Sequence, residues 1–188
     1  MKWGKLFLLL PALAVLAGCP VVSKNVVGLE DYRLDAQKID GTWINQDGAI
    51  LIKTLDAEKG LLKMIFLEDK ERIETAKVKI MKGKEWLYFN MLPEDDDQEP
   101  QYLWGRISIE ERRIIFWHAA NSAFAEAVKK KRIKGRIDSK KQISGEMSFE
   151  TSTVILTDSA KNIINLVETA EKNYFVWDAP VVFIKLAK

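Results

Sequence analysis

The sequence is poor in the residues that most often carry enzymatic or metal chemistry. It contains one cysteine and one histidine among 188 residues. One cysteine excludes a disulfide within the chain, and one histidine excludes a two-histidine zinc site. A Ser-His-Asp triad would need His118, and no serine lies in a Gly-x-Ser-x-Gly elbow. We therefore expect no catalytic residue, no metal and no cofactor, in a protein that is not an enzyme.

Carboxylates are the remaining reactive groups, and none of them is singled out. The acidic run Glu94–Asp97, followed by Glu99, offers oxygens that calcium prefers, but its spacing does not match an EF-hand loop. Prolines flank the run, which is typical of a solvated loop. No pair among the 27 acids has a pattern typical of a glycosidase. His118, at the end of an apolar run, is typical of a structural histidine.

Charged residues are also absent from the stretch Leu6–Ala17, directly after Lys2 and Lys5. This apolar stretch is shorter than the roughly 20 residues of a membrane span. A basic start, a short apolar core and small residues at its end predict a secretion signal over residues 1–18. Without it, the 29 basic residues fall to 27 and balance the 27 acids. A neutral chain gives no electrostatic reason to expect nucleic-acid binding.

The end of this segment, Leu16–Cys19, reads Leu-Ala-Gly-Cys and resembles the lipobox of bacterial lipoproteins. The resemblance implies a diacylglycerol on the sulfur of Cys19, cleavage between Gly18 and Cys19, and acylation of the new amine by a fatty acid such as palmitate. The membrane is then a partner through this lipid. Pro20 follows the cysteine, where an aspartate would mark inner-membrane retention, so the resemblance points to the outer membrane, facing the periplasm.

The remainder is predicted to be one β-rich domain over 39–188, joined to Cys19 by a tether over 19–38. Because the tether contains apolar residues such as Val27 and Leu34, part of it is expected to dock on the domain. Runs of β-branched and aromatic residues alternate with turn signals such as Asp47-Gly48, which predicts strands. The expected strands are 49–55, 61–67, 76–80, 85–92, 101–109, 112–118, 133–137, 142–150, 152–156 and 180–186. This pattern is typical of a mainly β fold, a single antiparallel barrel or sandwich.

Two helices are expected near the C-terminus. A short one follows Ala120 and can be capped by Asn121 or Ser122. A longer one over 159–172 carries apolar residues at helical spacing. The cations of 129–132 at the end of the short helix either meet anionic lipid headgroups or form a solvated helix end.

Gly41-Thr42-Trp43 resembles the Gly-x-Trp at the first strand of lipocalins. The resemblance implies an eight-stranded up-and-down barrel that binds a lipid or small apolar molecule. It also implies an arginine packed on the tryptophan, for which Arg132 and Arg136 are candidates. The candidate ligand-lining residues share aromatic rings on neighbouring expected strands; they are Trp86, Tyr88, Tyr102 and Trp104.

Two functions of different classes follow. The first is a membrane-anchored lipoprotein whose barrel binds a lipid or small apolar ligand. The second is a non-catalytic accessory lipoprotein that binds a protein of an envelope assembly through its surface.

Overall fold

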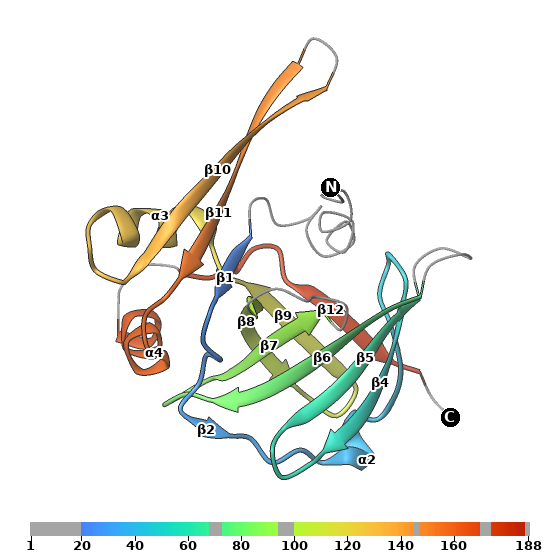
Figure 1. Cartoon of the computed structure of the whole chain (residues 1–188). Helices are drawn as coiled ribbons and strands as arrows, with labels where there is room; N and C mark the ends of the chain where they lie inside the picture. The colour runs from blue at the N-terminus through green and yellow to red at the C-terminus, as the bar shows by residue number, and fades with distance from the viewer. Residues whose placement is uncertain (1–19, 68–72, 94–99, 145–146, 170–173, 187–188) are drawn as a thin grey trace.

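The computed structural model describes residues 20–67, 73–93, 100–144, 147–169 and 174–186, which form a mainly β fold built around a closed barrel (Figure 1). The barrel strands are β3 (Gly41–Ile44), β4 (Ala49–Asp56), β5 (Leu61–Leu67), β6 (Ile73–Lys82), β7 (Leu87–Pro93), β8 (Tyr102–Ile109), β9 (Arg113–His118) and β12 (Val181–Lys185). From β3 to β9 each strand pairs antiparallel with the next, and β12 closes the barrel between β9 and β3. The predicted single antiparallel barrel is confirmed.

The inward-facing side chains of the eight barrel strands fill the interior of the barrel. Along β4, Ile50 is buried and its neighbour Leu51 is exposed, as the two-residue period of a strand requires. Aromatic rings lie in the middle of the barrel: the ring centre of Phe116 is 5.2 Å from that of Phe89 and 6.0 Å from that of Phe183. An eight-stranded barrel is just wide enough for side chains to fill it, or for one small ligand. Here side chains occupy the centre.

The N-terminal segment packs on the barrel rather than hanging free. It contains β1 (Val21–Ser23), β2 (Glu30–Asp31) and the short helix α2 (Ala36–Ile39). Val27 is fully buried, and the side chain of Asn90 on β7 both accepts from its N–H (2.6 Å) and donates to its carbonyl (2.9 Å). The segment 19–38, expected as a tether, is therefore part of the fold from Pro20 onward. Its apolar residues gain more by burial than by remaining in solvent.

The chain between β9 and β12 leaves the barrel and builds a second layer beside it. This part contains α3 (Asn121–Lys129), β10 (Gly135–Ser144), β11 (Met147–Leu156) and α4 (Ala160–Thr169). Both helices pack on the outer side of the barrel, where a second apolar core includes Phe124, Ile163 and Trp104. No helix in the described ranges is long and apolar enough to span a membrane.

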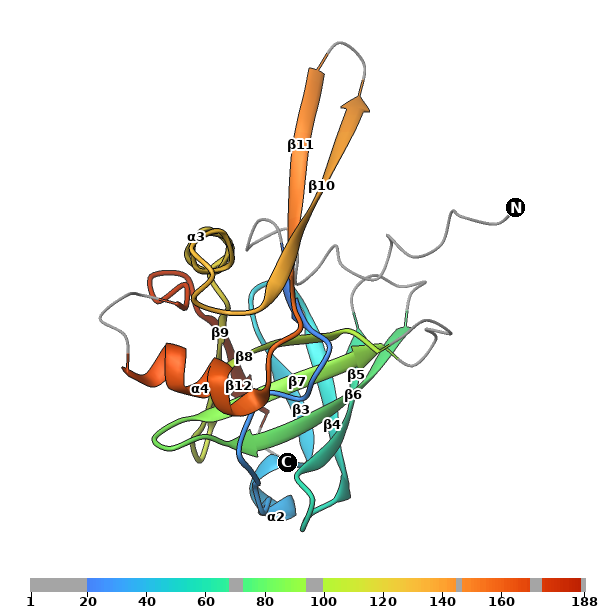
Figure 2. The same cartoon turned by 60° about the vertical axis from the view of Figure 1, so that its left-hand side comes forward.

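Strands β10 and β11 form a hairpin that projects away from the barrel, on the side opposite α2 (Figures 1 and 2). Their register runs unbroken from Gly135 opposite Leu156 to Ser144 opposite Met147. The sequence predicts three short strands here, and the structure has two long ones because each residue pairs across the hairpin. Strand β1 pairs with both β11 and β8, and so joins the hairpin to the barrel.

Candidate functional site

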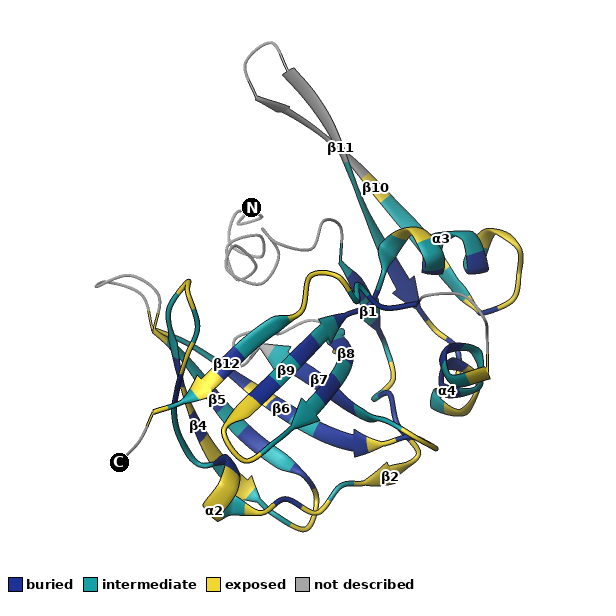
Figure 3. Cartoon of the chain, turned by 180° about the vertical axis from the view of Figure 1, so that it is seen from behind, coloured by how far each residue is buried: buried dark blue, intermediate teal, exposed yellow. Residues whose placement is uncertain are grey.

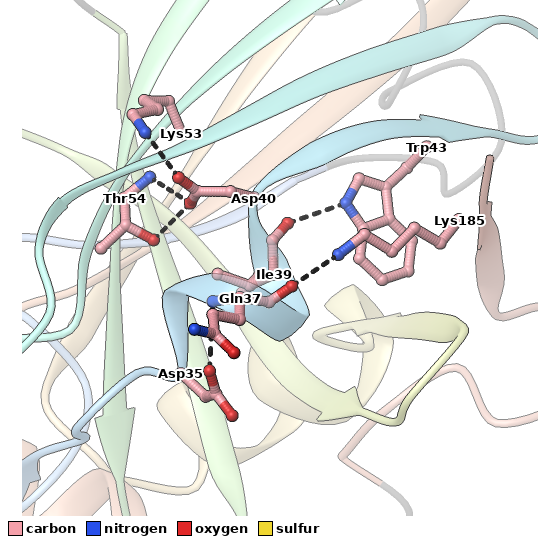
Figure 4. A network of polar contacts seen from close by, with 8 residues as sticks. All are labelled: Asp35, Gln37, Ile39, Asp40, Trp43, Lys53, Thr54 and Lys185. Carbon is pink, nitrogen blue, oxygen red and sulfur yellow. Dashed lines mark hydrogen bonds and ion pairs between the residues drawn. The ribbon is translucent and has the colours of Figure 1, made fainter. Parts of the chain in front are cut away.

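Helix α2 closes one end of the barrel, and polar contacts hold it there (Figure 4). The indole Nε1 of Trp43 donates to the carbonyl of Ile39 at 2.9 Å. The Nζ of Lys185 lies 5.2 Å from the Trp43 ring centre and donates to the carbonyls of Gln37 (3.2 Å) and Lys38. Carbonyls in the last turn of a helix have no partner within the helix. These two side chains supply the missing donors.

The cation on this tryptophan is a lysine of the last strand, not one of the two arginines that the lipocalin resemblance suggested. Arg132 lies exposed after α3, and Arg136 on β10 forms an ion pair with Asp138 at 3.0 Å. Strand β12 pairs with β3 so that Lys185 is opposite Trp43. The pairing brings the last barrel strand beside the first one. The lipocalin resemblance implied an arginine on the tryptophan, so it gave no reason to consider a lysine.

Asp40 fixes the junction between α2 and β3 (Figure 4). Its carboxylate accepts from Thr54 N (2.7 Å), Thr54 Oγ1 (2.6 Å) and Lys53 Nζ (2.7 Å). Burial alone would raise the pKa of Asp40, but the hydrogen bonds from Lys53 and Thr54 outweigh it and lower the pKa. With Ile39 buried beneath it, this end of the barrel is shut by structural contacts.

The opposite end is less completely covered by the residues described. The inward-facing side chains of Phe66, Leu103 and Val181 are only partly buried there. His118 lies nearby on β9, its ring centre 6.3 Å from that of Phe89. Its Nε2 is buried without a hydrogen-bond partner, and burial lowers the pKa of this histidine.

The aromatic residues proposed to line a ligand site lie outside the barrel. Tyr88 and Trp104 are fully buried in the second core, and Trp86 packs against it. Tyr102 has the same outward parity as Trp104 on β8 and is half-buried. The hydroxyl of Tyr88 donates to Glu168 at 2.8 Å, and its pKa is raised, first by burial and then by this carboxylate. Aromatic residues occupy both faces of these strands, so the sequence did not reveal which face is inside.

A second aromatic group was not anticipated from the sequence. The rings of Trp86, Trp117 and Trp177 surround the guanidinium of Arg106 on the outer side of β8. Alternation along β8 could have placed Arg106 on the same side as Trp104. Trp177 comes from a segment about 70 residues later, between α4 and β12, so its position had no local signal.

Five exposed aliphatic residues lie on the outer side of strands β12, β3, β4, β5 and β6, and we call them the apolar face; Figure 3 marks the exposed positions of the chain in yellow. Ile184 on β12 is opposite Ile44 on β3, and Leu67 on β5 is opposite Ile73 on β6. In the strand register Ala49 of β4 lies between these pairs, and Leu51 is two positions further along the same strand. The side chains of the apolar face range from 38% exposed at Ile44 to 72% at Ile73. Exposed apolar residues gathered on one side of a barrel are a candidate site of association.

The charged candidates offer no comparable site. The acidic run 94–99 lies outside the described residues. The cations of 129–132 are exposed, and Lys130 pairs with Glu126 at 2.7 Å, as at a solvated helix end. Asn121 does not cap α3 with its side chain, which donates instead to the carbonyls of Pro20 and Ser152. Within the ranges described, no group of three or more His, Cys, Asp or Glu residues could hold a metal ion.

Taken together, the geometry comprises a filled barrel shut at one end, an exposed apolar face, and an arginine among tryptophans beside the second core. No protein-family model, no curated protein and no solved structure matches the chain, so these features alone support a function.

Proposed function

We propose that the protein is a lipid-anchored lipoprotein of the bacterial envelope that binds a partner protein through the apolar face of its barrel, without catalysis. The apolar face carries the proposal. Leu51 and Ile184 are 39% and 51% exposed although the barrel has an interior that could bury aliphatic side chains. The apolar core inside the barrel, which includes Phe89 and Phe116, already occupies that interior, so the apolar surface available to a partner is on the outside. A partner covering the face would remove it from water at roughly 25 cal/mol per Å².

The anchoring half of the proposal rests on the lipobox at Leu16–Cys19 and is supported by the position of Pro20. The carbonyl of Pro20 accepts from Val154 N at 3.1 Å and from Asn121 Nδ2 at 3.4 Å, beside the base of the projecting hairpin. A lipid on Cys19 would thus lie one residue, about 3.8 Å along the chain, from a fixed point of the fold. The domain would be held against the membrane surface with little slack.

Anchoring is tested by changing Cys19 to Ser in cells fed a labelled fatty acid. We expect the wild-type protein to carry the label and to be found in the outer-membrane fraction. The Cys19→Ser variant should carry no label and be absent from that fraction. A Cys19→Ser protein that is still cut and still fractionates with the membrane would contradict the anchor. The described fold begins at Pro20, so the variant should unfold at the same denaturant concentration as wild type.

The partner-binding half is tested by a photo-crosslinking residue placed at Leu51 or Ile184 in cells. Both positions are expected to give the same discrete crosslinked product. The matched control is Leu55, which lies on the same side of the same strand, is 48% exposed and is separated from Leu51 by Lys53. Charge reversal of the face by Leu51→Glu should abolish the complex while Leu55→Glu preserves it. Absence of any product specific to the face, in cells that anchor the protein normally, would contradict partner binding.

Ligand binding inside the barrel is the second candidate, favoured by the partly buried Phe66, Leu103 and Val181 and by the unpaired Nε2 of His118. A small apolar molecule with one hydrogen-bonding group would suit such an end. It would have to displace or extend beyond the ring contacts that cross the centre. This candidate predicts a co-purified molecule, and it is tested independently of the crosslinking.

A further inference from the structure

The guanidinium of Arg106 is enclosed by three indole rings, which we call the tryptophan box. Its central carbon lies 4.8, 4.7 and 4.8 Å from the ring centres of Trp86, Trp117 and Trp177. Two of the walls contact the third, because Trp177 lies 5.7 Å from each of the other two rings. Trp117 is directly opposite Arg106 across β8 and β9, and Tyr88 is opposite it across β7 and β8. The guanidinium of Arg106 is therefore contacted both by a side chain of the neighbouring strand β9 and by Trp177 from the segment between α4 and β12.

This arginine has no anionic partner in the part of the chain that the structure describes. Its Nε is buried and makes no hydrogen bond. Glu168, which reaches the adjacent Tyr88, is engaged by the Tyr88 hydroxyl (2.8 Å) and by Lys84 N (3.0 Å). Burial lowers the pKa of Arg106, but an arginine remains charged at neutral pH. A charged group with five N–H donors is thus half-buried with its Nε donor unused.

Indole rings attract a cation through their faces but accept no conventional hydrogen bond from it. They also fix the orientation of a planar guanidinium, which lowers the entropy lost when it binds a ligand. Arg106 as a whole is only partly buried, and its two terminal nitrogens are not among the buried atoms without a partner. Their donors match two oxygens of one phosphate group. The arrangement lacks only the anion.

We propose that Arg106 and the tryptophan box form a binding site for a phosphate group, either free or carried on a lipid. The terminal nitrogens of Arg106 bind two phosphate oxygens, and the indole rings pack against whatever apolar group the phosphate carries. The site is on the outer side of β8, whereas the apolar face spans β12 to β6, so its occupancy is independent of the proposed partner binding.

The test titrates the full chain, extracted in an uncharged maltoside detergent, with sodium phosphate at constant ionic strength set by sodium chloride. Tryptophan fluorescence reports on the box, and the NMR signal of the Arg106 Nε–H reports on the cation. A saturable change with a dissociation constant of about 1 mM or tighter is expected for a charged bidentate contact. Arg106→Lys keeps the charge but not the paired donors, and should weaken binding at least tenfold.

Three comparisons make the outcome decisive. Arg106→Gln should abolish the response, whereas Arg112→Gln, which removes an exposed arginine elsewhere, should leave it unchanged. Water-soluble dihexanoyl phosphatidic acid distinguishes the sources: tighter binding than inorganic phosphate identifies a lipid-borne group, and equal binding identifies free phosphate. If Arg106→Gln fails to fold, two results still test the proposal: weaker phosphate binding by Arg106→Lys, and a shift of the Arg106 Nε–H NMR signal of the wild-type protein on titration. A linear response, or one that Arg106→Lys and Arg106→Gln retain in full, shows an adventitious ion only and overturns the proposal.

Discussion

Removing one ring from the middle of the barrel tests whether the interior is filled. Phe116 is 4% exposed and contacts the rings of Phe89 and Phe183 at 5.2 and 6.0 Å. Truncating a buried phenylalanine to alanine costs about 3–5 kcal/mol, of which each ring pair contributes about 0.5–1.5. We expect Phe116→Ala to lower the free energy of unfolding by about 4 kcal/mol. Domains are stable by about 5–15 kcal/mol, so the variant should still fold.

The assay is urea unfolding followed by tryptophan fluorescence. With a denaturant dependence of about 2.5 kcal/mol per molar, the midpoint should fall by about 1.6 M at unchanged slope. Leu55→Ala, at an exposed position, is the control and should change stability by less than about 0.5 kcal/mol. The new cavity should also bind a small apolar probe such as benzene. A loss below about 1.5 kcal/mol for Phe116→Ala would refute the filled interior, because the ring would then border existing space.

Three further predictions concern the closed end and the N-terminal segment, and equilibrium unfolding checks each. Lys185→Met should lower the free energy of unfolding by about 1.5–3 kcal/mol, since it removes charged donors and the cation over Trp43. A loss below about 0.5 kcal/mol would contradict the conclusion that Lys185 holds α2 on the barrel. Asp40 has a pKa below the ordinary 3.8, so its stabilisation is present above pH 3.8 and disappears as pH falls through the lowered value. Asp40→Asn should thus be less stable than wild type near neutral pH, with the difference shrinking below about pH 4; a constant difference would refute the assignment. Gly28→Ala should cost at least about 2 kcal/mol, because φ is +144° and the added Cβ would lie 2.1 Å from Cβ of Met81; a neutral effect would show that this close packing is absent.

The barrel could be predicted from sequence because its strands are local and strongly patterned. The predicted strand 61–67, for example, coincides with β5. Alternation cannot tell which side of a strand is inside when both sides are apolar. For that reason Tyr88 and Trp104 were interpreted as ligand-lining although they face the second core.

Features that depend on distant parts of the chain were not predictable. The apolar residues of the tether predicted that part of it docks on the domain, but not that the side chain of Asn90 binds the backbone of Val27, 63 positions earlier. The position of Arg106 among the tryptophans depends on Trp177, and no period links the two. Such contacts depend on how the second layer packs on the barrel, which no local pattern records.

The central claim is a filled barrel that acts through its surface, and native mass spectrometry of the Arg106→Gln chain, as cells produce it, tests this claim most directly. This background prevents the guanidinium from retaining a phosphate-bearing molecule. We expect the mass of the chain with the covalent lipid proposed for Cys19, and with nothing else bound. A discrete additional mass that is released as a lipid or small apolar molecule would contradict the claim and favour ligand binding inside the barrel.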